Sequence, residues 1–359
     1  MKKLRLGIIG TGGIVRACHI KPLAAHPEIE IVAACDIVPE KLAKFAKEFS
    51  IPATYADYRE LLARDDIDAV DICTPNHLHS VIAVEALKRG KHVFTEKPDA
   101  VSAEEAAKME QAAVDSGKIL MAMRNNRYRP DTRFLKDYIR AGSMGSIYAA
   151  KCGWIRRRGI PGAGGWFTTK AQSGGGPLID LGVHMIDVTL WMMGNPRPVS
   201  VVGSTFREFA DNTAQADSAN ADFGEKKAGG IFDVEDMATG YIKLDSGACI
   251  SIEFSWASNV EKEDAYFELM GTKAGASCHW GAPLKIFGEA EGRLVDSLPL
   301  VGDANGSGGL GAHGLNLYHF VDCVLRGVKP DFVPRQGVDM IKILSAIYRS
   351  AETGREVVL

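Results

Sequence analysis

The 359-residue chain is predicted to be an α/β protein, with a doubly wound parallel sheet in residues 1–123 and an α+β domain in residues 124–359. Residues 1–122 alternate short apolar runs with helical stretches whose apolar residues recur about every 3.6 positions, which is typical of parallel strands covered by helices on both faces. After about residue 124 the apolar runs follow one another through short turns, which favours an antiparallel or mixed sheet. The chain length also favours two domains.

In the amino-terminal half, five apolar runs are predicted to be strands, with amphipathic helices between them. Ser102 precedes one helix and Glu105 is its third residue, as in a capping box. Gly117 follows the same helix, where a C-cap glycine is expected. The predicted strands are residues 4–9, 29–35, 69–73, 92–95 and 119–123, and the helices include 39–49 and 102–116.

In the carboxyl-terminal half, helices and strands are predicted in a different order. A turn at Asp245-Ser246-Gly247 predicts a hairpin between two strands. Polar residues 207–230 are predicted to be a long, mobile surface loop, and residues 303–314 a second, glycine-rich loop. The predicted helices are 130–140, 177–193 and 338–350, the last ending near Gly354, and the predicted strands are 147–157, 199–206, 237–244, 248–256 and 266–270.

The composition is that of an ordinary soluble globular protein, with 46% apolar and 24% charged residues. A net charge of −3 gives no electrostatic reason to expect nucleic acid or an anionic membrane as a partner. Seven scattered cysteines without a CxxC pair argue against disulfides and thiolate metal sites. With no signal-peptide pattern and no membrane-spanning run, the protein is predicted to be cytoplasmic.

A glycine-rich turn follows the first predicted strand and opens a helix. Glycines let the backbone approach a pyrophosphate closely, and the N–H groups of a helix N-terminus attract it. Asp36 ends the next strand, 26 positions after Gly10, where its carboxylate can accept both adenosine ribose hydroxyls and repel a 2′-phosphate. The pattern predicts a dinucleotide site that prefers NAD to NADP, the alternative being an ordinary strand–turn–helix connection. The residues of the turn are Gly10, Thr11, Gly12, Gly13 and Ile14.

A second candidate cofactor segment follows the strand at 69–73 and reads Thr74-Pro75-Asn76-His77-Leu78-His79. Ligands of parallel α/β sheets bind at the carboxyl ends of the strands, which is where this segment is expected. The structural alternative is a helix start with Asn76 as its N-cap.

Three residues are predicted to carry acid–base chemistry. Lys97 follows the strand at 92–95, so its ammonium should point toward the nicotinamide pocket and lower the pKa of a reacting hydroxyl. Asp180 and His184 are four positions apart and share a helix face, so the carboxylate can hold the imidazole that takes the hydroxyl proton. Gly174-Gly175-Gly176 is expected to leave room for a ligand beside that helix. A purely structural Asp–His pair is the alternative.

Zinc-dependent chemistry is the competing dehydrogenase mechanism. His77 and His79 together with Asp180 and His184 offer suitable ligand types, but no metal-binding motif connects them. No metal site is therefore predicted.

These motifs resemble the glucose–fructose oxidoreductase and inositol dehydrogenase family (Gfo/Idh/MocA) along the whole chain. The resemblance lies in the glycine turn, TPNxxH at 74–79, EKP at 96–98, GGGxxxDxGxH at 174–184, and Val234-Glu235-Asp236. It implies a Rossmann domain followed by a domain with a large open, mostly antiparallel sheet, through which a homodimer or homotetramer forms. Two positions depart from the family pattern, namely Val15 and Phe167.

The resemblance also implies roles for individual residues. NAD(P) binding falls to the glycine turn, Asp36, Thr74, Asn76 and Glu96. Their positions at the edge of the predicted sheet make Pro75, His79 and Lys97 further candidate cofactor contacts. The catalytic residues are Lys97, Asp180 and His184, which also contact substrate. Trp166 falls where family members place cofactor and sugar contacts, and its ring can stack on a sugar. Candidate hydroxyl contacts are Asn125, Asn126, Tyr128, Arg156 and Arg157.

The sequence thus predicts an NAD-dependent dehydrogenase acting on a secondary hydroxyl of a sugar, glycoside or cyclitol. One alternative is a family member that keeps and recycles its NAD, oxidising transiently for elimination or glycoside cleavage. Another is a non-enzymatic NAD-sensing regulator, which would have lost its catalytic groups.

Overall fold

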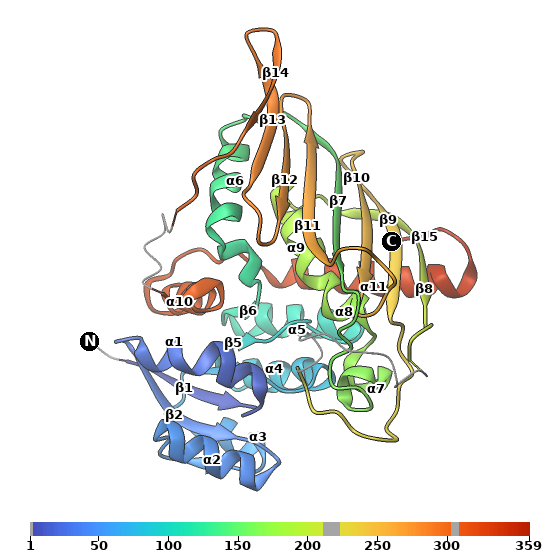
Figure 1. Cartoon of the computed structure of the whole chain (residues 1–359). Coiled ribbons are helices and arrows are strands. Elements are labelled where there is room, and N and C mark those ends of the chain that lie inside the picture. The colour runs from blue at the N-terminus through green and yellow to red at the C-terminus, as the bar shows by residue number, and fades with distance from the viewer. Residues whose placement is uncertain (1–2, 211–222, 303–308) are drawn as a thin grey trace. The chain divides into compact units, whose positions relative to one another are not determined.

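The computed structural model describes residues 3–210, 223–302 and 309–359 (Figure 1). The chain forms two compact units, one made of residues 1–125 and 308–341, the other of residues 126–307 and 342–359. The predicted domain border at residue 123 places residues 308–341 in the carboxyl-terminal domain, whereas in the structure they belong to the first unit.

The first unit contains a six-stranded sheet in which neighbouring strands are parallel, with the order β3-β2-β1-β4-β5-β6. This order confirms the predicted doubly wound sheet, because the chain leaves the central strand β1 first in one direction and then in the other. The two-residue strand β3 is too short to have been predicted. The strands are β1 (Leu4–Ile9), β2 (Ile29–Cys35), β3 (Thr54–Tyr55), β4 (Ala69–Ile72), β5 (His92–Thr95) and β6 (Leu120–Ala122).

The two helices whose bounds were predicted, at 39–49 and 102–116, lie within one residue of those bounds. Ser102 accepts a hydrogen bond from the backbone N–H of Glu105, and Gly117 adopts the left-handed conformation after the last turn. Both helix ends are therefore stabilised locally, by a cap side chain and by a residue without a Cβ. The helices are α2 (Pro39–Phe49), α3 (Tyr58–Leu62), α4 (His79–Lys88) and α5 (Ala103–Ser116).

The helix after the glycine turn begins with a π-helical turn, Val15–His19, before α1 (Ile20–Ala25). Such wide turns occur often at functional sites. Val15 is fully buried here, so the larger side chain at this position is accommodated in the core.

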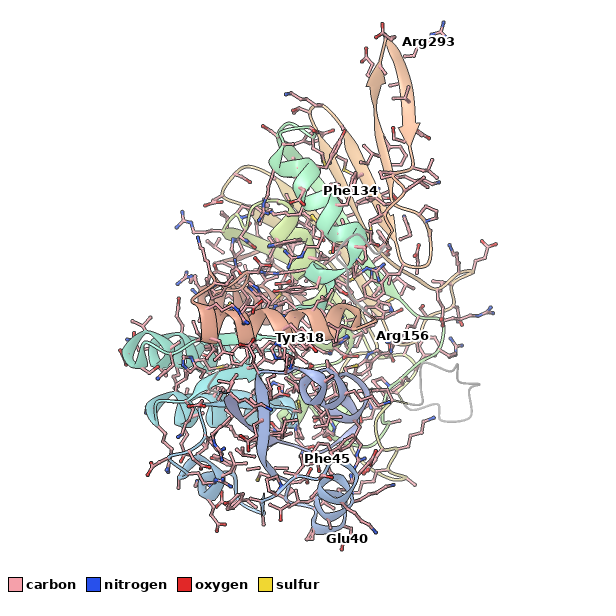
Figure 2. The ribbon with its side chains drawn as sticks, turned by 90° about the vertical axis from the view of Figure 1, so that its left-hand side faces the viewer. Glu40, Phe45, Phe134, Arg156, Arg293 and Tyr318 are labelled. Atoms are coloured by element: carbon pink, nitrogen blue, oxygen red, sulfur yellow. The ribbon has the colours of Figure 1, made fainter. Side chains whose placement is uncertain are left out.

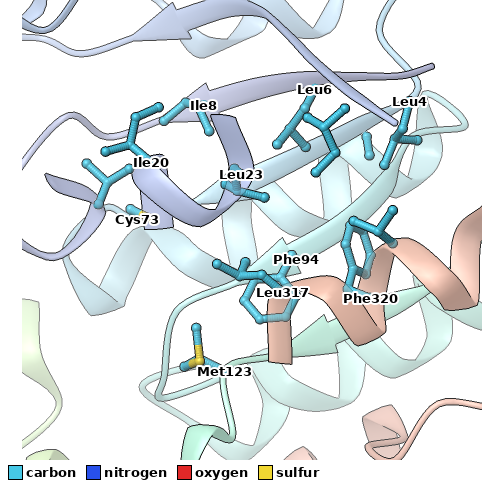
Figure 3. Packing of buried hydrophobic residues seen from close by; sticks show 14 of the residues in the cluster. Leu4, Leu6, Ile8, Ile20, Leu23, Cys73, Phe94, Met123, Leu317 and Phe320 are labelled. Carbon is cyan, nitrogen blue, oxygen red and sulfur yellow. The ribbon is translucent and has the colours of Figure 1, made fainter. Parts of the chain in front are cut away.

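A helix from the far end of the sequence, α10 (Gly311–Arg326), completes the core of the first unit. Leu317 and Phe320 pack with Leu4 and Phe94, and the Phe94 and Phe320 rings meet edge to face at 5.4 Å (Figure 3). Burying each of these large side chains stabilises the fold by about 1.5–3 kcal/mol. The predicted loop at 303–314 is wrong for residues 311–314, because they begin this helix, while 303–308 lie outside the described residues.

The second unit is built on a nine-stranded sheet with the order β14-β13-β12-β11-β7-β10-β9-β8-β15. β7 and β10 pair in parallel and the other neighbouring strands pair in antiparallel orientation, which confirms the mostly antiparallel sheet. The strands are β7 (Ile147–Ile155), β8 (Pro198–Phe206), β9 (Met237–Leu244), β10 (Cys249–Ser255), β11 (Asp264–Gly271), β12 (Gly275–His279), β13 (Lys285–Ala290), β14 (Arg293–Ser297) and β15 (Val357–Val358).

Helices lie on one face of this sheet (Figure 1). The predicted helix 177–193 is interrupted at Leu181, which separates α8 (Pro177–Asp180) from α9 (Gly182–Met192). The other helices are α6 (Pro130–Arg140), α7 (Lys170–Ser173) and α11 (Pro334–Thr353), whose last turns belong to this unit.

Several antiparallel strands of the second unit that follow one another in sequence are joined by hairpin turns. Asp245-Ser246-Gly247 joins β9 to β10 as predicted, with Gly247 at a φ of 83°. The β13–β14 hairpin, which was not predicted, turns at Glu291 and Gly292, both at positive φ, and Figure 2 shows Arg293 at its tip. A two-residue turn of this kind suits the twist of antiparallel strands.

Residues 207–230 contain no helix or strand in the parts that are described, as predicted for a loop. Lys227 donates its backbone N–H to Ala163, and Phe223 packs edge to face on Phe167. Residues 211–222 of the predicted mobile loop lie outside the described residues.

Candidate active site

The glycine turn of the first unit has the geometry that its sequence requires. A Cβ at Gly10 would lie 2.4 Å from the carbonyl oxygen of Cys73, and the residue has a φ of 97°, so only glycine fits. Cβ atoms at Gly12 and Gly13 would meet nothing within 4 Å. The turn is therefore packed against β4 on one side and open on the other, which suits the close approach of a pyrophosphate.

Asp36 lies beside this turn. Its Oδ2 accepts hydrogen bonds from the backbone N–H and the hydroxyl of Thr11, both at 2.8 Å, and its Oδ1 accepts one from the N–H of Val38. The structure thus brings the predicted ribose-binding carboxylate to the glycine turn and fixes its orientation.

The segment after β4 offers a further polar group for a cofactor. Thr74 Oγ1 is buried without a hydrogen-bond partner among the described residues, whereas buried hydroxyls normally have one. Asn76 is buried and starts a 3-10 turn, with Pro75 before it. The open glycines, Asp36 and this orphaned hydroxyl fit a bound dinucleotide.

His79 has a different position from that expected of a cofactor contact. Its ring is fully buried, with Nδ1 2.7 Å from the carbonyl oxygen of Pro98 and Nε2 2.8 Å from that of Thr74. Burial lowers the pKa of His79. The side chain therefore ties the segment after β4 to the segment after β5.

Glu96 and Lys97 follow β5, at the carboxyl end of the parallel sheet. Glu96 is buried: its Oε1 lies 2.8 Å from His19 Nε2, and its Oε2 accepts the backbone N–H of Lys97 at 3.0 Å. Burial raises its pKa, but the hydrogen bond and charge of His19, with the charge of Lys97, outweigh burial and lower the pKa of Glu96 to about 2. Glu96 is thus an ionised residue whose carboxylate oxygens contact His19 and the Lys97 backbone.

His19 was not predicted from any sequence motif. It is fully buried, and its Nδ1 lies 2.9 Å from Asp71 Oδ2. Burial opposes protonation, but Cys73 and Asp71 outweigh it and raise the pKa of His19 well above its ordinary value. The imidazole is therefore an imidazolium that bridges two buried carboxylates.

His19, Asp71 and Cys73 are also the group of metal-ligand type found in the described part of the chain. The hydrogen bonds to Asp71 and Glu96 occupy both nitrogens of the His19 ring. Because a metal ligand needs a nitrogen lone pair, this protonated ring does not fit a metal ion. The zinc alternative through His79 also lacks support, since both nitrogens of His79 face carbonyl oxygens.

Asp180 and His184 belong to the second unit, on α8 and α9. Asp180 Oδ2 accepts a hydrogen bond from Trp256 Nε1 at 3.0 Å, and the His184 ring centre lies 6.1 Å from that of Trp154. Both residues are half-buried. A fixed carboxylate one turn before a partly accessible imidazole is suited to proton transfer.

The glycine run before α8 has another role than the one predicted. A Cβ at Gly175 would lie 1.9 Å from Tyr348 Oη, and one at Gly176 would lie 2.0 Å from the carbonyl oxygen of Glu235. These glycines therefore allow close protein packing, and the expectation that Gly175 and Gly176 leave room for a ligand is wrong.

Glu235 fixes the start of α8. Its carboxylate accepts the backbone N–H groups of Gly176 at 2.9 Å and Leu178 at 3.1 Å, and the hydroxyl of Tyr348 at 2.8 Å. Burial raises the pKa of Glu235 to about 7, although these hydrogen bonds act in the opposite direction. A carboxylate at the N-terminus of a helix is also favoured by the helix dipole.

Arg156, Trp154 and Trp280 form a cluster of one cationic and two aromatic side chains, and Trp154 is the tryptophan near His184. The Arg156 guanidinium lies 5.2 Å from the ring centre of Trp154, which meets Trp280 edge to face at 4.5 Å. Arg156 Nη1 donates to the Gly159 carbonyl at 3.1 Å, whereas Nε is buried without a hydrogen-bond partner among the described residues. An aromatic face beside an unsatisfied donor is suited to a polyhydroxylated ligand.

The other predicted substrate residues are placed less uniformly. Arg157 is exposed and its backbone N–H donates to Glu263, while Tyr128 is buried under the guanidinium of Arg133. Asn126 is buried against Met185. Trp166 is half-buried and stacks on Phe167 at 3.8 Å, so one of its faces is covered, and Asn125 begins the 3-10 turn Asn125–Tyr128.

Three tryptophans of the second unit, Trp154, Trp256 and Trp280, were not predicted to belong to the site. Trp256 lies 76 positions from Asp180, and Trp280 follows a strand that the sequence pattern did not indicate. Only the strand pairing reveals these neighbours, so no local signal in the sequence could have identified them.

No described helix has the length and apolar character needed to cross a membrane.

Known proteins resemble this chain over most of its length. Residues 4–123 match the oxidoreductase family model with an NAD-binding Rossmann fold, and residues 132–277 match the GFO/IDH/MocA C-terminal domain. D-glucoside 3-dehydrogenase of Escherichia coli K12 is 31% identical over 99% of this chain and 97% of its own length. Levoglucosan dehydrogenase of Pseudarthrobacter phenanthrenivorans is 31% identical over 76% of this chain and 73% of its own length.

Solved structures agree with these sequence matches. A levoglucosan dehydrogenase in complex with NADH and L-sorbose superimposes with a TM-score of 0.87 at 25% identity, covering 100% of this chain and 99% of that one. The chain has the doubly wound sheet, the glycine turn, and Asp180 and His184 on α8 and α9. Together with these features, the matches show that the chain belongs to the Gfo/Idh/MocA family of NAD-binding oxidoreductases.

Proposed function

We propose that this protein is an NAD-dependent dehydrogenase that oxidises a secondary hydroxyl of a sugar, glycoside or cyclitol to a ketone. The observation that carries the proposal is the half-buried Asp180–His184 pair in a unit that also offers Trp154 and Arg156. The relatives named for glucoside and levoglucosan oxidation support this class of substrate.

In this proposal each catalytic residue has one task. His184 accepts the proton of the substrate hydroxyl, and Asp180, held by Trp256, orients the ring and stabilises the imidazolium that forms. Lys97 hydrogen-bonds the same oxygen and stabilises its developing negative charge. Bound NAD supplies the acceptor for the hydride that leaves the carbon.

NAD is proposed as the preferred cofactor, held by the glycine turn, Asp36 and the Thr74–Asn76 segment. The Asp36 carboxylate is already fixed by Thr11, so it presents a negative charge that a 2′-phosphate would meet. Thr74 Oγ1 supplies a buried polar atom that needs a partner.

The substrate is proposed to stack on Trp154 and to donate and accept hydrogen bonds at Arg156 and His184. A pyranose presents C–H groups to an aromatic face and hydroxyls to a guanidinium, so this cluster can bind both parts of a sugar. Trp166, Asn125, Asn126, Tyr128 and Arg157 remain proposed contacts.

A homo-oligomer is proposed to form through the face of the nine-stranded sheet that points away from its helices. On that face Val202 pairs directly with Tyr241, and both side chains are exposed. The next paired residues across the sheet are Ser251, Lys151 and Glu268, which gives a polar continuation of the apolar edge.

The function is tested by incubating the purified protein with NAD and a panel of sugars, glycosides and cyclitols. Formation of reduced nicotinamide with at least one of them, and a ketone at one ring carbon by NMR, is the expected result. Binding of NAD without oxidation of any polyol in the panel would contradict the proposed substrate class.

A further inference from the structure

The four residues Glu96–Asp99 are anchored one after another in the first unit. His19 contacts the Glu96 carboxylate, and that carboxylate accepts the Lys97 N–H. His79 contacts the carbonyl oxygen of Pro98, and Asp99 forms a buried ion pair with Arg124. Lys97 is the member of this segment whose side chain stays partly accessible.

Two of the four residues, Glu96 and Asp99, are buried carboxylates. Glu96 and Asp99 are about as buried as core residues, at 5% and 4% exposure. A carboxylate is buried at this cost only when hydrogen bonds and opposite charge compensate it. Each buried carboxylate here has a buried cation next to it, His19 for Glu96 and Arg124 for Asp99.

His19 is the least replaceable of these partners. It is completely buried and bridges Asp71 on β4 to Glu96 after β5, so one ring joins the ends of two neighbouring strands. A neutral side chain at this position would remove the ring that contacts both buried carboxylates. Glu96 would then relax toward water and release the Lys97 backbone.

We propose that His19 is a positioning residue for Lys97, acting as a buried cation that holds Glu96 and thereby the Lys97 backbone. The inference rests on the proposed function, in which the Lys97 ammonium contacts the reacting hydroxyl. His19 itself touches neither substrate nor cofactor in this scheme. Its effect on turnover therefore passes entirely through Lys97.

A double-mutant cycle tests this dependence. The variants are His19→Gln, Lys97→Ala and the double variant, with His92→Asn as a matched control, because His92 is a half-buried histidine of the same unit whose Nδ1 accepts a backbone N–H from Ile119. We expect His19→Gln to lower kcat by roughly 10- to 100-fold, as when a charge-assisted hydrogen bond is removed. The same change in Lys97→Ala should lower kcat by less than about threefold.

The cycle separates the failure of this inference from the failure of the proposed function. If Lys97→Ala turns over like the wild type, Lys97 has no catalytic role and the proposed function fails with it. If Lys97→Ala is impaired but His19→Gln costs the same factor in both backgrounds, His19 acts only on the fold and the inference is overturned. The control His92→Asn should leave kcat near the wild-type value.

A measurement on the unmodified protein covers the case in which His19→Gln does not fold. Nitrogen-15 NMR of the histidine rings in the NAD-bound enzyme should reveal one imidazolium that stays protonated at mildly alkaline pH. A neutral His19 ring, or a stoichiometric metal ion lost with Cys73→Ser, would overturn the inference.

Discussion

Trp256 donates its indole N–H to the carboxylate of Asp180 at 3.0 Å, from a strand end 76 positions along the chain. Trp256 is fully buried, and its own backbone N–H donates to Asp236. The carboxylate that is proposed to orient His184 is therefore fixed by the core of the second unit. A defect at this contact should affect proton transfer before it affects cofactor binding.

The first prediction concerns Trp256→Phe. Loss of a hydrogen bond to a charged group, worth about 1.5–3 kcal/mol, should lower kcat by roughly 10- to 100-fold. The NAD dissociation constant should change little, because Trp256 lies in the second unit. Steady-state kinetics and calorimetric titration check both values, and a normal kcat would mean that Asp180 is oriented by other contacts.

His184→Ala should lower kcat by roughly 10²–10⁴, since the missing imidazole acts in the transition state. The affinity for NAD and the melting temperature should stay near the wild-type values, because His184 is only half-buried. Unfolding of this variant, or near-normal turnover, would favour a structural Asp–His pair.

Asp36→Ala should weaken NAD binding, because it removes the carboxylate that binds the adenosine ribose. It should also lower the ratio of the NADP to the NAD dissociation constant by about tenfold or more, because the same carboxylate repels the 2′-phosphate of NADP. Dissociation constants for both nucleotides measure this change. Glu40→Ala on the exposed start of α2 is the control and should alter neither constant. Tighter NADP than NAD binding by the wild type would contradict the role of Asp36.

Glu235 should make stability depend on pH. Its pKa is raised to about 7 in the folded state, from an ordinary value of 4.5. Below 4.5 both folded and unfolded chains carry the proton, whereas between 4.5 and 7 only the folded chain keeps it, so the contribution to stability falls as pH rises through this window. Between these limits the free energy of unfolding should fall by up to about 3 kcal/mol relative to Glu235→Gln.

Urea unfolding of the wild type and Glu235→Gln across this pH range checks the prediction. Because all other titratable groups are shared, the difference between the two proteins isolates Glu235. A difference that is constant with pH would show that folding does not raise the pKa of Glu235.

Tyr241→Glu should dissociate the proposed oligomer, since it places a charge in the apolar part of the open sheet face. Phe134→Glu is the matched control, because Phe134 on α6 is also 38% exposed but lies on a helix. Light scattering after size-exclusion chromatography should give the smaller mass for Tyr241→Glu alone. Equal masses for the wild type and both variants would contradict an interface at this face.

Helix caps and apolar periodicity in the sequence predicted the ends of α5 and the central strands correctly. The capping pair Ser102 and Glu105, the C-cap Gly117 and the central strands appear where the pattern placed them. The helix α10 was missed because its first turn contains Gly311 and Gly314, which are typical of loops. The exposed strands β13 and β14 lack the alternation that a half-buried strand shows.

The candidate site could be predicted where its residues are close in sequence or follow a motif of known spacing, as Asp36 follows the glycine turn. Asp180 and His184, or Glu96 and Lys97, reveal their relationship by spacing. His19 and Asp71 are 52 positions apart and become partners only when the parallel sheet forms. Glu235 and Gly176 likewise meet only in the folded unit, which is why the glycine run was interpreted as space for a ligand.

The borders between the two units, at residues 125/126, 307/308 and 341/342, mean that the polypeptide passes between them three times. A fragment cut after residue 125 would therefore lack α10 and expose the side of Phe94 that Phe320 covers. Recombination that exchanges one half of such a protein at a single crossover would carry away part of the other half's core. New specificities in this architecture are thus expected to arise by substitution and loop insertion within an intact chain.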